Sequence, residues 1–418
     1  MASKQKHLIL LESLFFSTGF EACRIAKELG YQVTLICRDI KLYLQGIPLD
    51  KHPLGLADFH IETETNDTQN LIKFLESYYD KRPFQGLLTF SEYYVDIAAQ
   101  VASHFGFPSA SPISVQIARN KDLSRIQLAK NKISSPKFRI VKNLEEALAA
   151  VSVIGYPCII KPTAETSSYG VECVSNNEEL LKAFNNANSI LKNEREQRRE
   201  GTVLVEEYMI GEEISVETIS VNGECNILGF TSKGLTGWPN FVEYEFSFPY
   251  NIPVNMIDPV KNLVKDSLRA IGYTHGPSHT EVKLTKDGPK IVEINPRLGG
   301  RFIPKMILDS LGIDPMKEVI KLAMGESVDL MPKQNMGAAW SAIPAPETGF
   351  LNVIEGEDEV LTSLGVKLFK LDVKVGDFIR LPKSNQAIGC IYTFGKDETE
   401  ARNSLRKALS KLKLHVNN

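Results

Sequence analysis

The chain lacks the cysteine spacing of a zinc site or of a disulfide framework. Its six cysteines are scattered over 418 residues, and none belongs to a CxxC pair. Several of them lie within apolar runs, where a buried and reduced thiol is the ordinary state. A reducing compartment fits this pattern, so we expect a cytoplasmic protein.

Long hydrophobic runs and an excess of one charge are also missing. The apolar run behind Lys4 and Lys6 is interrupted at Glu12 and has no small-x-small cleavage site after it, so we do not expect a signal peptide. No other apolar stretch is long enough to cross a bilayer. The net charge of −3 creates no global basic field. We therefore expect neither nucleic acid nor a membrane as a partner.

Two common nucleotide-binding patterns are absent. No GxGxxG follows the first predicted strand, and GxxxxGK[ST] is found nowhere, so neither a dinucleotide fingerprint nor a Walker loop is predicted. The stretch KNEREQRRE at 192–200 mixes both signs of charge. Such a stretch is typical of a solvated helix face, and a partner-binding arm is the alternative.

The predicted elements divide the chain into three parts. Strands and helices alternate in residues 1–110, which predicts βαβ units and a parallel sheet. A turn-rich SASP sequence at 109–112 marks a boundary, after which residues 111–333 have an α+β texture with antiparallel hairpins, and residues 334–418 form a small α/β unit. The elements are strands at 7–12, 32–37, 86–90, 157–162, 202–208, 213–221, 289–296, 365–375 and 388–395, and helices at 20–29, 95–105, 143–151 and 398–412.

The densest pattern is EVKLTKDGPKIVEINPR at 281–297, which predicts two strands joined by a turn at KDGP. Side chains at i and i+2 of a strand share a face, so Glu293 and Asn295 point the same way, and Glu281 can join them across the hairpin. Three oxygen donors on one face suit a hard cation that also binds phosphate oxygens. An ordinary hairpin with an exposed polar face is the alternative.

Two further segments could bind a nucleotide. In IIKPTAETSSYGV at 159–171, Lys161 supplies a point charge and the following loop offers hydroxyls and backbone N–H groups to phosphate. In VLVEEYMIGEEISVE at 203–217, a Gly-centred bend offers backbone groups to an adenine edge, and Glu213 can accept from ribose hydroxyls. A polar surface turn and a hairpin with acidic edges are the respective alternatives.

These segments occur in the order of the ATP-grasp superfamily, which the chain resembles over residues 1 to about 330. The resemblance implies an ATP-grasp fold with an N-terminal βαβ (pre-ATP-grasp) domain, a lid subdomain at about 135–208 and catalytic hairpins at about 209–330. It also implies ATP and Mg²⁺ as cofactors, with Mn²⁺ able to substitute. The residues that the resemblance assigns are Lys121 and Lys161 on the phosphates, Ser167, Ser168 and Gly170 in the loop that closes over them, Glu206, Glu207, Tyr208 and Met209 at the adenine hinge, Glu213 at the ribose, and Glu281, Glu293 and Asn295 on the metal. Thr166 stands where many relatives have glycine, which leaves the closing geometry of the loop open.

The resemblance implies small-molecule carboxylate and amine substrates: the carboxylate attacks the γ-phosphorus of ATP, and the amine captures the acyl phosphate. Positioning and charge neutralisation are the main contributions of the protein in phosphoryl transfer. Arg297 is placed to hold the carboxylate and the transferring phosphoryl with a bidentate fork. Arg301 is a second candidate, with a surface helix arginine as the alternative.

The segment HGPSHTEVKL is similar to that of bacterial L-amino-acid ligases, the dipeptide-forming branch. His279 would share a face with Glu281, near the metal and the acyl phosphate, unless it is a structural histidine. An ATP-dependent carboxylase or transformylase and a non-catalytic ATP-binding protein remain alternatives on the same fold. Loops at 233–239 and 241–250 could line substrate pockets or simply pack the domain. The oligomeric state is open, with a homodimer as the common case for soluble enzymes.

Overall fold

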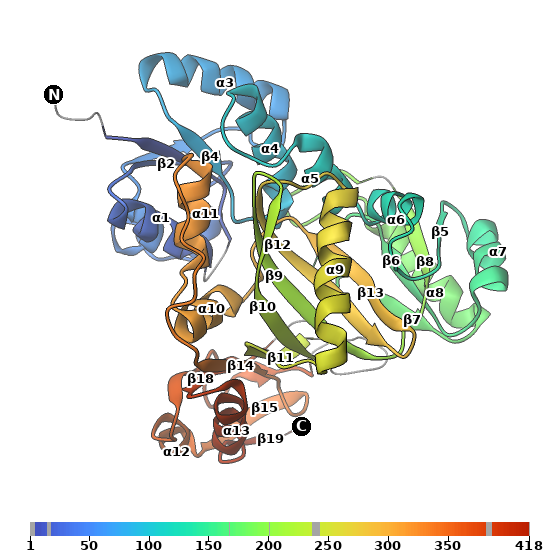
Figure 1. Ribbon diagram of the computed structural model, residues 1–418. Coiled ribbons are helices and arrows are strands. Elements are labelled where there is room, and N and C mark those ends of the chain that lie inside the picture. The colour runs from blue at the N-terminus through green and yellow to red at the C-terminus, as the bar shows by residue number, and fades with distance from the viewer. Residues whose placement is uncertain are drawn as a thin grey trace.

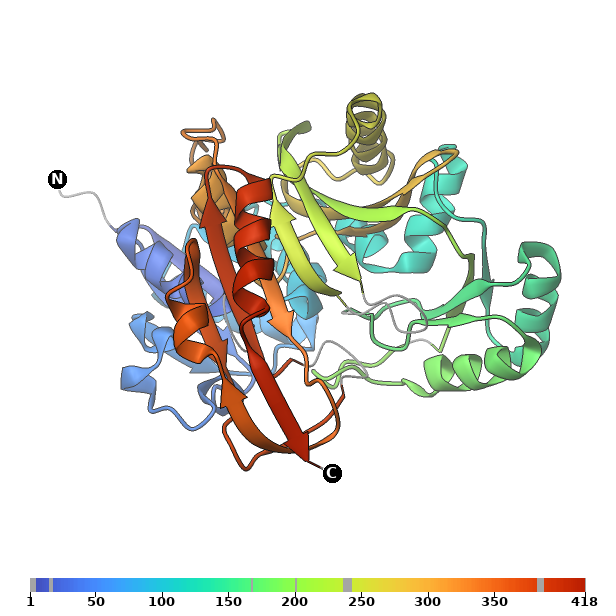
Figure 2. The same cartoon turned by 90° about the horizontal axis from the view of Figure 1, so that it is seen from below.

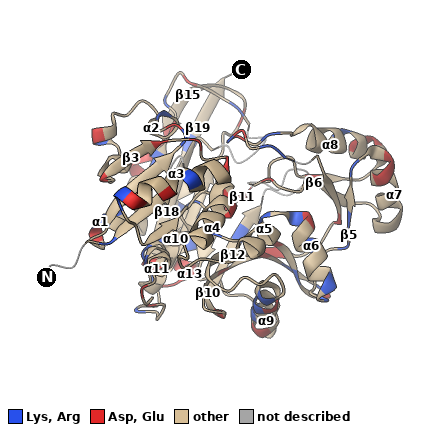
Figure 3. Cartoon of the chain, turned by 90° about the horizontal axis from the view of Figure 1, so that it is seen from above, with Lys and Arg blue, Asp and Glu red and all other residues tan. Residues whose placement is uncertain are grey.

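The computed structural model describes residues 5–14, 18–166, 168–199, 201–235, 243–381 and 387–417, and these form four sheets (Figure 1). Within these residues no helix combines the length and apolarity that a bilayer-crossing segment needs. Lys and Arg lie beside Asp and Glu on helices such as α3 (Thr68–Lys81) and α9 (Val254–Ala270), in line with the balanced composition (Figure 3).

The N-terminal sheet is parallel, as predicted, with the order β3-β2-β1-β4. Every residue of β1 is buried, because helices cover both faces of such a sheet and its strands read as continuous hydrophobic runs. The strand β3 was not predicted, since it is short, only partly buried and without a clear pattern. The elements are β1 (His7–Leu11), α1 (Thr18–Glu28), β2 (Gln32–Cys37), α2 (Lys41–Leu44), η1 (Leu49–Lys51), η2 (Pro53–Leu56), β3 (Phe59–Glu62), α3, β4 (Gly86–Leu88), η3 (Glu92–Tyr94), α4 (Val95–His104), α5 (Pro112–Arg119) and α6 (Lys121–Lys130).

A second four-stranded sheet, of order β5-β8-β6-β7, is packed against two helices at the far side of the molecule (Figure 1). Both helices start with an Asn-x-x-Glu capping box: Asn143 accepts from the backbone of Glu146, and Asn176 accepts from that of Glu179. We call this unit the lid. Its elements are β5 (Phe138–Val141), α7 (Leu144–Ile154), β6 (Cys158–Pro162), β7 (Glu172–Val174), α8 (Asn177–Ser189) and β8 (Val203–Glu207).

The charged stretch at 192–199 is not a solvated helix face, and that prediction is wrong. Its backbone is irregular, with an isolated bridge between Lys192 and Arg198. Arg195 is 2% exposed and reaches the N-terminal domain, where it donates to the Tyr43 hydroxyl at 3.0 Å and the Ser13 carbonyl at 3.1 Å. The segment therefore ties the lid to the N-terminal domain.

The central sheet is antiparallel, with the order β13-β12-β9-β10-β11-β14-β18-β16. It continues past residue 334, so strands of the C-terminal part extend the sheet that carries the predicted hairpin. The long helix α9 lies across β9, β10, β12 and β13 (Figure 1), and α10 packs against β11 and β14. The elements are β9 (Glu212–Val221), β10 (Glu224–Leu235), β11 (Glu243–Phe248), α9, β12 (Gly276–Thr285), β13 (Gly288–Asn295), α10 (Ile303–Leu311), α11 (Pro315–Ala323), β14 (Gly337–Ile343), β16 (Val366–Leu371) and β18 (Gly389–Gly395).

The C-terminal part adds a three-stranded sheet, β17-β15-β19, beside the end of the central one. Its helix α13 packs on β14 and β18 (Figure 2). This helix ends at residue 409, three residues before the predicted end, because the chain turns there into the edge strand β19. The domain bounds at 110 and 333 stay predictions. The elements are β15 (Gly349–Glu355), α12 (Glu357–Leu361), β17 (Phe378–Ile379), α13 (Glu398–Leu409) and β19 (Lys413–Asn417).

Gly211, in the bend between the lid and the central sheet, should tolerate no side chain. Its φ is +151°, and a Cβ there would lie 2.1 Å from the carbonyl oxygen of Leu284. We expect Gly211→Ala to lower the free energy of unfolding by about 2 kcal/mol or more, measured by urea denaturation. Gly223, with φ +92° and open space around its Cβ position, is the control. Equal losses for Gly211→Ala and Gly223→Ala would contradict the clash.

Candidate active site

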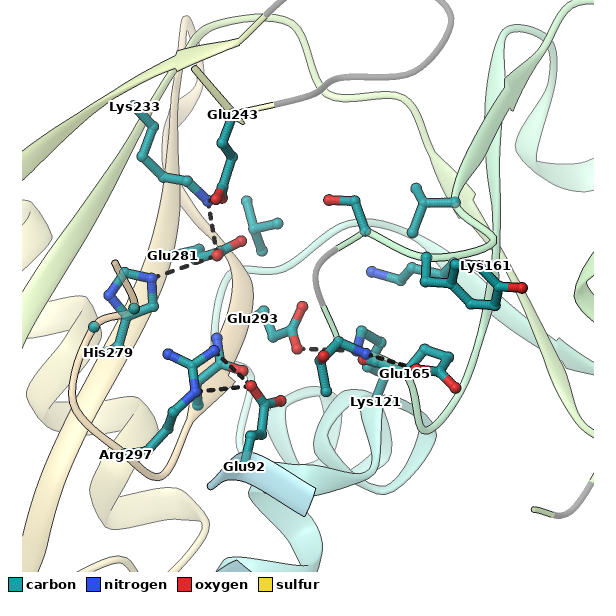
Figure 4. Close-up of a pocket in the computed structure, with 18 of the residues that line it drawn as sticks. Glu92, Lys121, Lys161, Glu165, Lys233, Glu243, His279, Glu281, Glu293 and Arg297 are labelled. Atoms are coloured by element: carbon teal, nitrogen blue, oxygen red, sulfur yellow. Dashed lines mark hydrogen bonds and ion pairs between the residues drawn. The ribbon is translucent and has the colours of Figure 1, made fainter. Parts of the chain in front are cut away.

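A cavity of about 850 Å³ lies between the lid, the central sheet and the N-terminal domain. Of the candidate residues from the sequence, all but two line it. Ser167 lies outside the described residues, and Gly170, with a left-handed φ of +74°, is not among the described residues at the cavity wall. Segments up to 205 residues apart in the sequence, from Glu92 to Arg297, are thus brought together, as Figure 4 shows for ten of the side chains.

The predicted hairpin is formed by β12 and β13, and its register places the polar residues in pairs. His279 lies opposite Asn295, and Glu281 lies opposite Glu293. All four line the cavity. The Asn295 amide lies between two carboxylates: its nitrogen can donate to Oε1 of Glu293 at 3.1 Å and to Oε1 of Glu92 at 3.3 Å.

The two candidate phosphate-binding lysines lie on different elements at the cavity wall. Lys121, at the start of α6, lies 2.9 Å from Oε1 of Glu293 and also donates to the Glu165 carbonyl. Lys161, on β6, lies 2.7 Å from Oε2 of Glu206, which Arg125 binds at 2.6 Å. Burial alone would raise the pKa of Glu206, but Arg125 and Lys161 hold it below its ordinary value. The Glu206 carboxylate thus holds the ammonium group of Lys161 at the cavity wall.

The other hinge residues surround the end of β8. Glu207 accepts from the backbone of Lys137 and pairs with Lys290 at 3.1 Å. Tyr208 and Met209 line the cavity just after the strand ends. Backbone N–H and C=O groups of this bend therefore lie at the cavity wall, where they could hydrogen-bond the edge of a planar ring.

Lys233 on β10 lies at the centre of three carboxylates. Its Nζ is 3.0 Å from Glu213, 2.6 Å from Glu243 and 2.7 Å from Glu281, and its side chain is 2% exposed. Burial by itself would lower the pKa of Lys233, but the carboxylates, Glu243 first, raise it well above the ordinary value. The sequence pointed to Lys233 only as the start of a pocket loop, because its carboxylate partners come from three other strands. Residues 236–242 of the two pocket loops lie outside the described residues.

His279 is held between the carboxylates of Glu217 and Glu281, and Figure 4 shows its contact with Glu281. Its Nδ1 is 3.0 Å from both oxygens of Glu217, and its Nε2 is 3.5 Å from Oε1 of Glu281. Glu217 also accepts from the hydroxyls of Ser215 and Thr231. Burial would lower the pKa of His279, but Glu217 and Glu281 raise it to about 9.

Arg297 reaches the N-terminal domain rather than standing alone in the cavity. Its Nε and Nη2 donate to one oxygen of Glu92 at 2.7 and 2.5 Å, and its Nη1 donates to the Leu298 carbonyl at 2.9 Å. Arg301 precedes α10 and lies 5.0 Å from the Trp340 ring centre, lining the cavity. The alternative of a surface helix arginine is therefore wrong for Arg301.

The donor set of the hairpin fits a hard divalent cation that shares phosphate oxygens. No three His, Cys, Asp or Glu side chains of the described segments are gathered as a complete metal site. The hairpin instead offers two carboxylates and an amide, Glu281, Glu293 and Asn295, at the wall of one cavity. Ions such as Mg²⁺ commonly use one or two carboxylates and complete their coordination with substrate phosphates and water.

Comparisons with known proteins agree with this geometry. Residues 154–305 match an ATP-grasp domain, residues 23–109 an ATP-grasp N-terminal domain, and residues 341–417 the L-amino acid ligase C-terminal domain 2. An uncharacterized protein of Sinorhizobium fredii is 27% identical over 89% of this chain and 78% of its own length. The alanine–anticapsin ligase of Bacillus subtilis is 25% identical over 79% of this chain and 72% of its own length. The L-amino acid ligase of Bacillus licheniformis superposes with a TM-score of 0.81 over the whole of both chains at 21% identity, which shows the shared fold.

The charge of His279 should make stability depend on pH. Its pKa of about 9 in the folded protein exceeds the ordinary 6.5, so the stabilisation is complete below pH 6.5 and is lost as pH rises through 9. We expect the thermal midpoint of the wild type to fall more between pH 6.5 and 9 than that of His279→Gln. The control is His104→Gln, which changes an exposed histidine beside Glu76 and should keep the wild-type dependence. An equal fall in all three proteins would contradict the charge assignment.

Proposed function

This chain belongs to the ATP-grasp superfamily, and we propose that it is an ADP-forming carboxylate–amine ligase that joins amino acids through an acyl phosphate. The observation that carries the proposal is the gathering of two lysines, the oxygen donors of one hairpin and Arg297 around a single cavity. The match of residues 341–417 to an L-amino acid ligase domain favours this branch over a carboxylase or a transformylase of the same fold.

We assign the nucleotide to the side of the cavity between the lid and the central sheet. Adenine would meet the backbone of Glu207, Tyr208 and Met209, and the ribose hydroxyls would donate to Glu213. Lys121 and Lys161 would hold phosphate oxygens, together with backbone and hydroxyl groups of the loop that includes Ser168. The carboxylates that now contact these lysines come from elements on both sides of the cavity, which supports this position for the triphosphate.

Glu281, Glu293 and Asn295 would hold Mg²⁺, or Mn²⁺ in its place. The ion would neutralise the β- and γ-phosphate oxygens. Lys233 and His279 contact Glu281 from the side and so fix the direction of its carboxylate. Neither contact involves Glu293, which pairs with Lys121 instead.

In the reaction, one oxygen atom passes from the substrate carboxylate to phosphate, and the amine loses one proton. A carboxylate oxygen of the first substrate bonds to the γ-phosphorus while the bond to the β–γ bridging oxygen breaks and ADP leaves. The amine nitrogen then bonds to the acyl carbon and loses a proton, and the bond from that carbon to the former carboxylate oxygen breaks, so that inorganic phosphate leaves with this oxygen. Arg297 compensates the negative charge as the carboxylate and the phosphoryl group approach, which is costly without a fixed cation between them.

The substrates are expected to be free amino acids or similar small acids and amines. The relative from Bacillus subtilis is named for ligation of alanine to anticapsin, and the chain spans 72% of its length. A homodimer and a cytoplasmic location stay predictions.

Amino acids should drive phosphate release from ATP and Mg²⁺ by the purified chain. We expect ADP and phosphate to form in equal amounts with suitable amino-acid pairs, and a dipeptide to be found by mass determination. Glu293→Gln should nearly abolish turnover while the fold is kept, and serves as the inactive control. Stoichiometric ADP formation with bicarbonate alone, and no need for an acid, would favour the carboxylase instead.

Replacing Arg297 should damage chemistry more than nucleotide binding. Lysine is a compact point charge that cannot reproduce the guanidinium fork, so we expect Arg297→Lys to lose on the order of a hundredfold in kcat, with a much smaller change in ATP affinity by calorimetry. Arg402→Lys is the control, because Arg402 also binds a buried carboxylate, Glu245, but outside the cavity. Retained kcat with lost ATP binding would place Arg297 in the nucleotide site.

A further inference from the structure

Glu92 is a buried carboxylate of the N-terminal domain that lines the cavity between this domain, the lid and the central sheet. It follows β4 at the carboxyl end of the parallel sheet, in the short turn η3, and is 6% exposed. Crevices outside the carboxyl ends of parallel strands are common places for ligand sites. Figure 4 shows its side chain directed at Arg297, which follows the hairpin of the central sheet.

The contacts of Glu92 are with residues that the proposed chemistry uses. One oxygen accepts from both Nε and Nη2 of Arg297. The other lies 3.7 Å from Nη1 of Arg119, and it accepts from the Asn295 amide nitrogen at 3.3 Å when that amide is oriented to donate to its carboxylate neighbours. A single side chain thus touches both the arginine and the amide of the sequence N-P-R at 295–297.

These contacts determine what Arg297 can offer to an anion. A guanidinium has five N–H donors in one plane. Two of those of Arg297 are taken by Glu92 and a third by the Leu298 carbonyl, so at most two remain for substrate oxygens. Because three donors are fixed, the plane of the group and the direction of the remaining donors are fixed as well. Without these contacts, the arginine side chain would lose conformational entropy each time it bound the substrate.

We propose that Glu92 is a positioning residue of the ligation reaction: it orients the Arg297 guanidinium, so that the N-terminal domain completes the acyl-phosphate site. The inference rests on the proposed function. It assigns Glu92 no contact with the reacting atoms, and its effect passes through Arg297. The alternative is a purely structural ion pair that holds two domains together.

Matched variants separate the two roles. Glu92→Gln keeps the size of the side chain but loses the charge. We expect kcat to fall about ten- to a hundredfold, the range typical when a residue that orients an active-site ligand is replaced. ATP affinity by calorimetry should change less than about threefold, because the assigned nucleotide contacts do not include Glu92. Glu92→Asp keeps the charge and should retain the fold, but the shorter stem withdraws the carboxylate, so a loss of several-fold in kcat is expected.

The control is Glu245→Gln. Glu245 is also buried and bound by two arginines, Arg402 and Arg406, both at 2.9 Å, but it lies outside the cavity. A structural pair of this kind should affect the thermal midpoint and leave kcat within about twofold.

The decisive measurement is the double variant Glu92→Gln with Arg297→Lys. If Glu92 acts through Arg297, the double variant loses no more kcat than Arg297→Lys alone. Losses that multiply, or a folded Glu92→Gln protein with wild-type kcat, would overturn the inference. Absence of amino-acid-dependent turnover in the wild type would instead contradict the proposed function, so the two failures are distinguishable.

Discussion

Charges buried in a low-dielectric cavity must be paired, and the pairs here join different parts of the chain. Removing an ion from water costs several kcal/mol, and this cost is offset only by close partners in good geometry. Lys121 of α6 meets Glu293 of the hairpin, Arg125 of α6 meets Glu206 of the lid, and Arg297 meets Glu92 of the N-terminal domain. The same contacts that compensate charge therefore also position the lid, the central sheet and the N-terminal domain around one cavity.

This pairing is compatible with the chemistry that we propose. A triphosphate and a divalent cation present opposite charges to the lysines and carboxylates, so both can enter without leaving a protein charge uncompensated. Glu281 keeps Lys233 and His279 as partners, and Arg297 keeps Glu92, so the groups nearest the reacting atoms remain oriented. In such a site the main contribution of the protein is preorganised charge, since phosphoryl transfer needs little covalent assistance.

Much of the fold could be predicted from local patterns. The hairpin at 281–297 was visible because strand periodicity and a turn sequence agree over adjacent residues, and its register brings Glu281 and Glu293 together as expected. Partners from distant segments were not predictable. Glu217 and Glu243 fall within segments that the sequence singles out and Glu92 does not, but no pattern marks any of the three, and they become part of the site only through tertiary folding. The prediction of a solvated helix face at 192–199 is wrong for the same reason, because the partners of Arg195 lie over 150 residues away in the N-terminal domain. The roles of the candidate residues themselves stay predictions.

The central claim is that a substrate carboxylate oxygen is transferred to phosphate. It is tested most directly with an amino acid whose carboxylate carries two ¹⁸O atoms, followed by mass analysis of the phosphate and the ligated product. The account predicts one ¹⁸O atom in the inorganic phosphate and the other in the new amide, because the oxygen that attacks the γ-phosphorus leaves with it. Unlabelled phosphate, with both labels kept in the acid, would mean that water attacks ATP, and would contradict the acyl-phosphate mechanism.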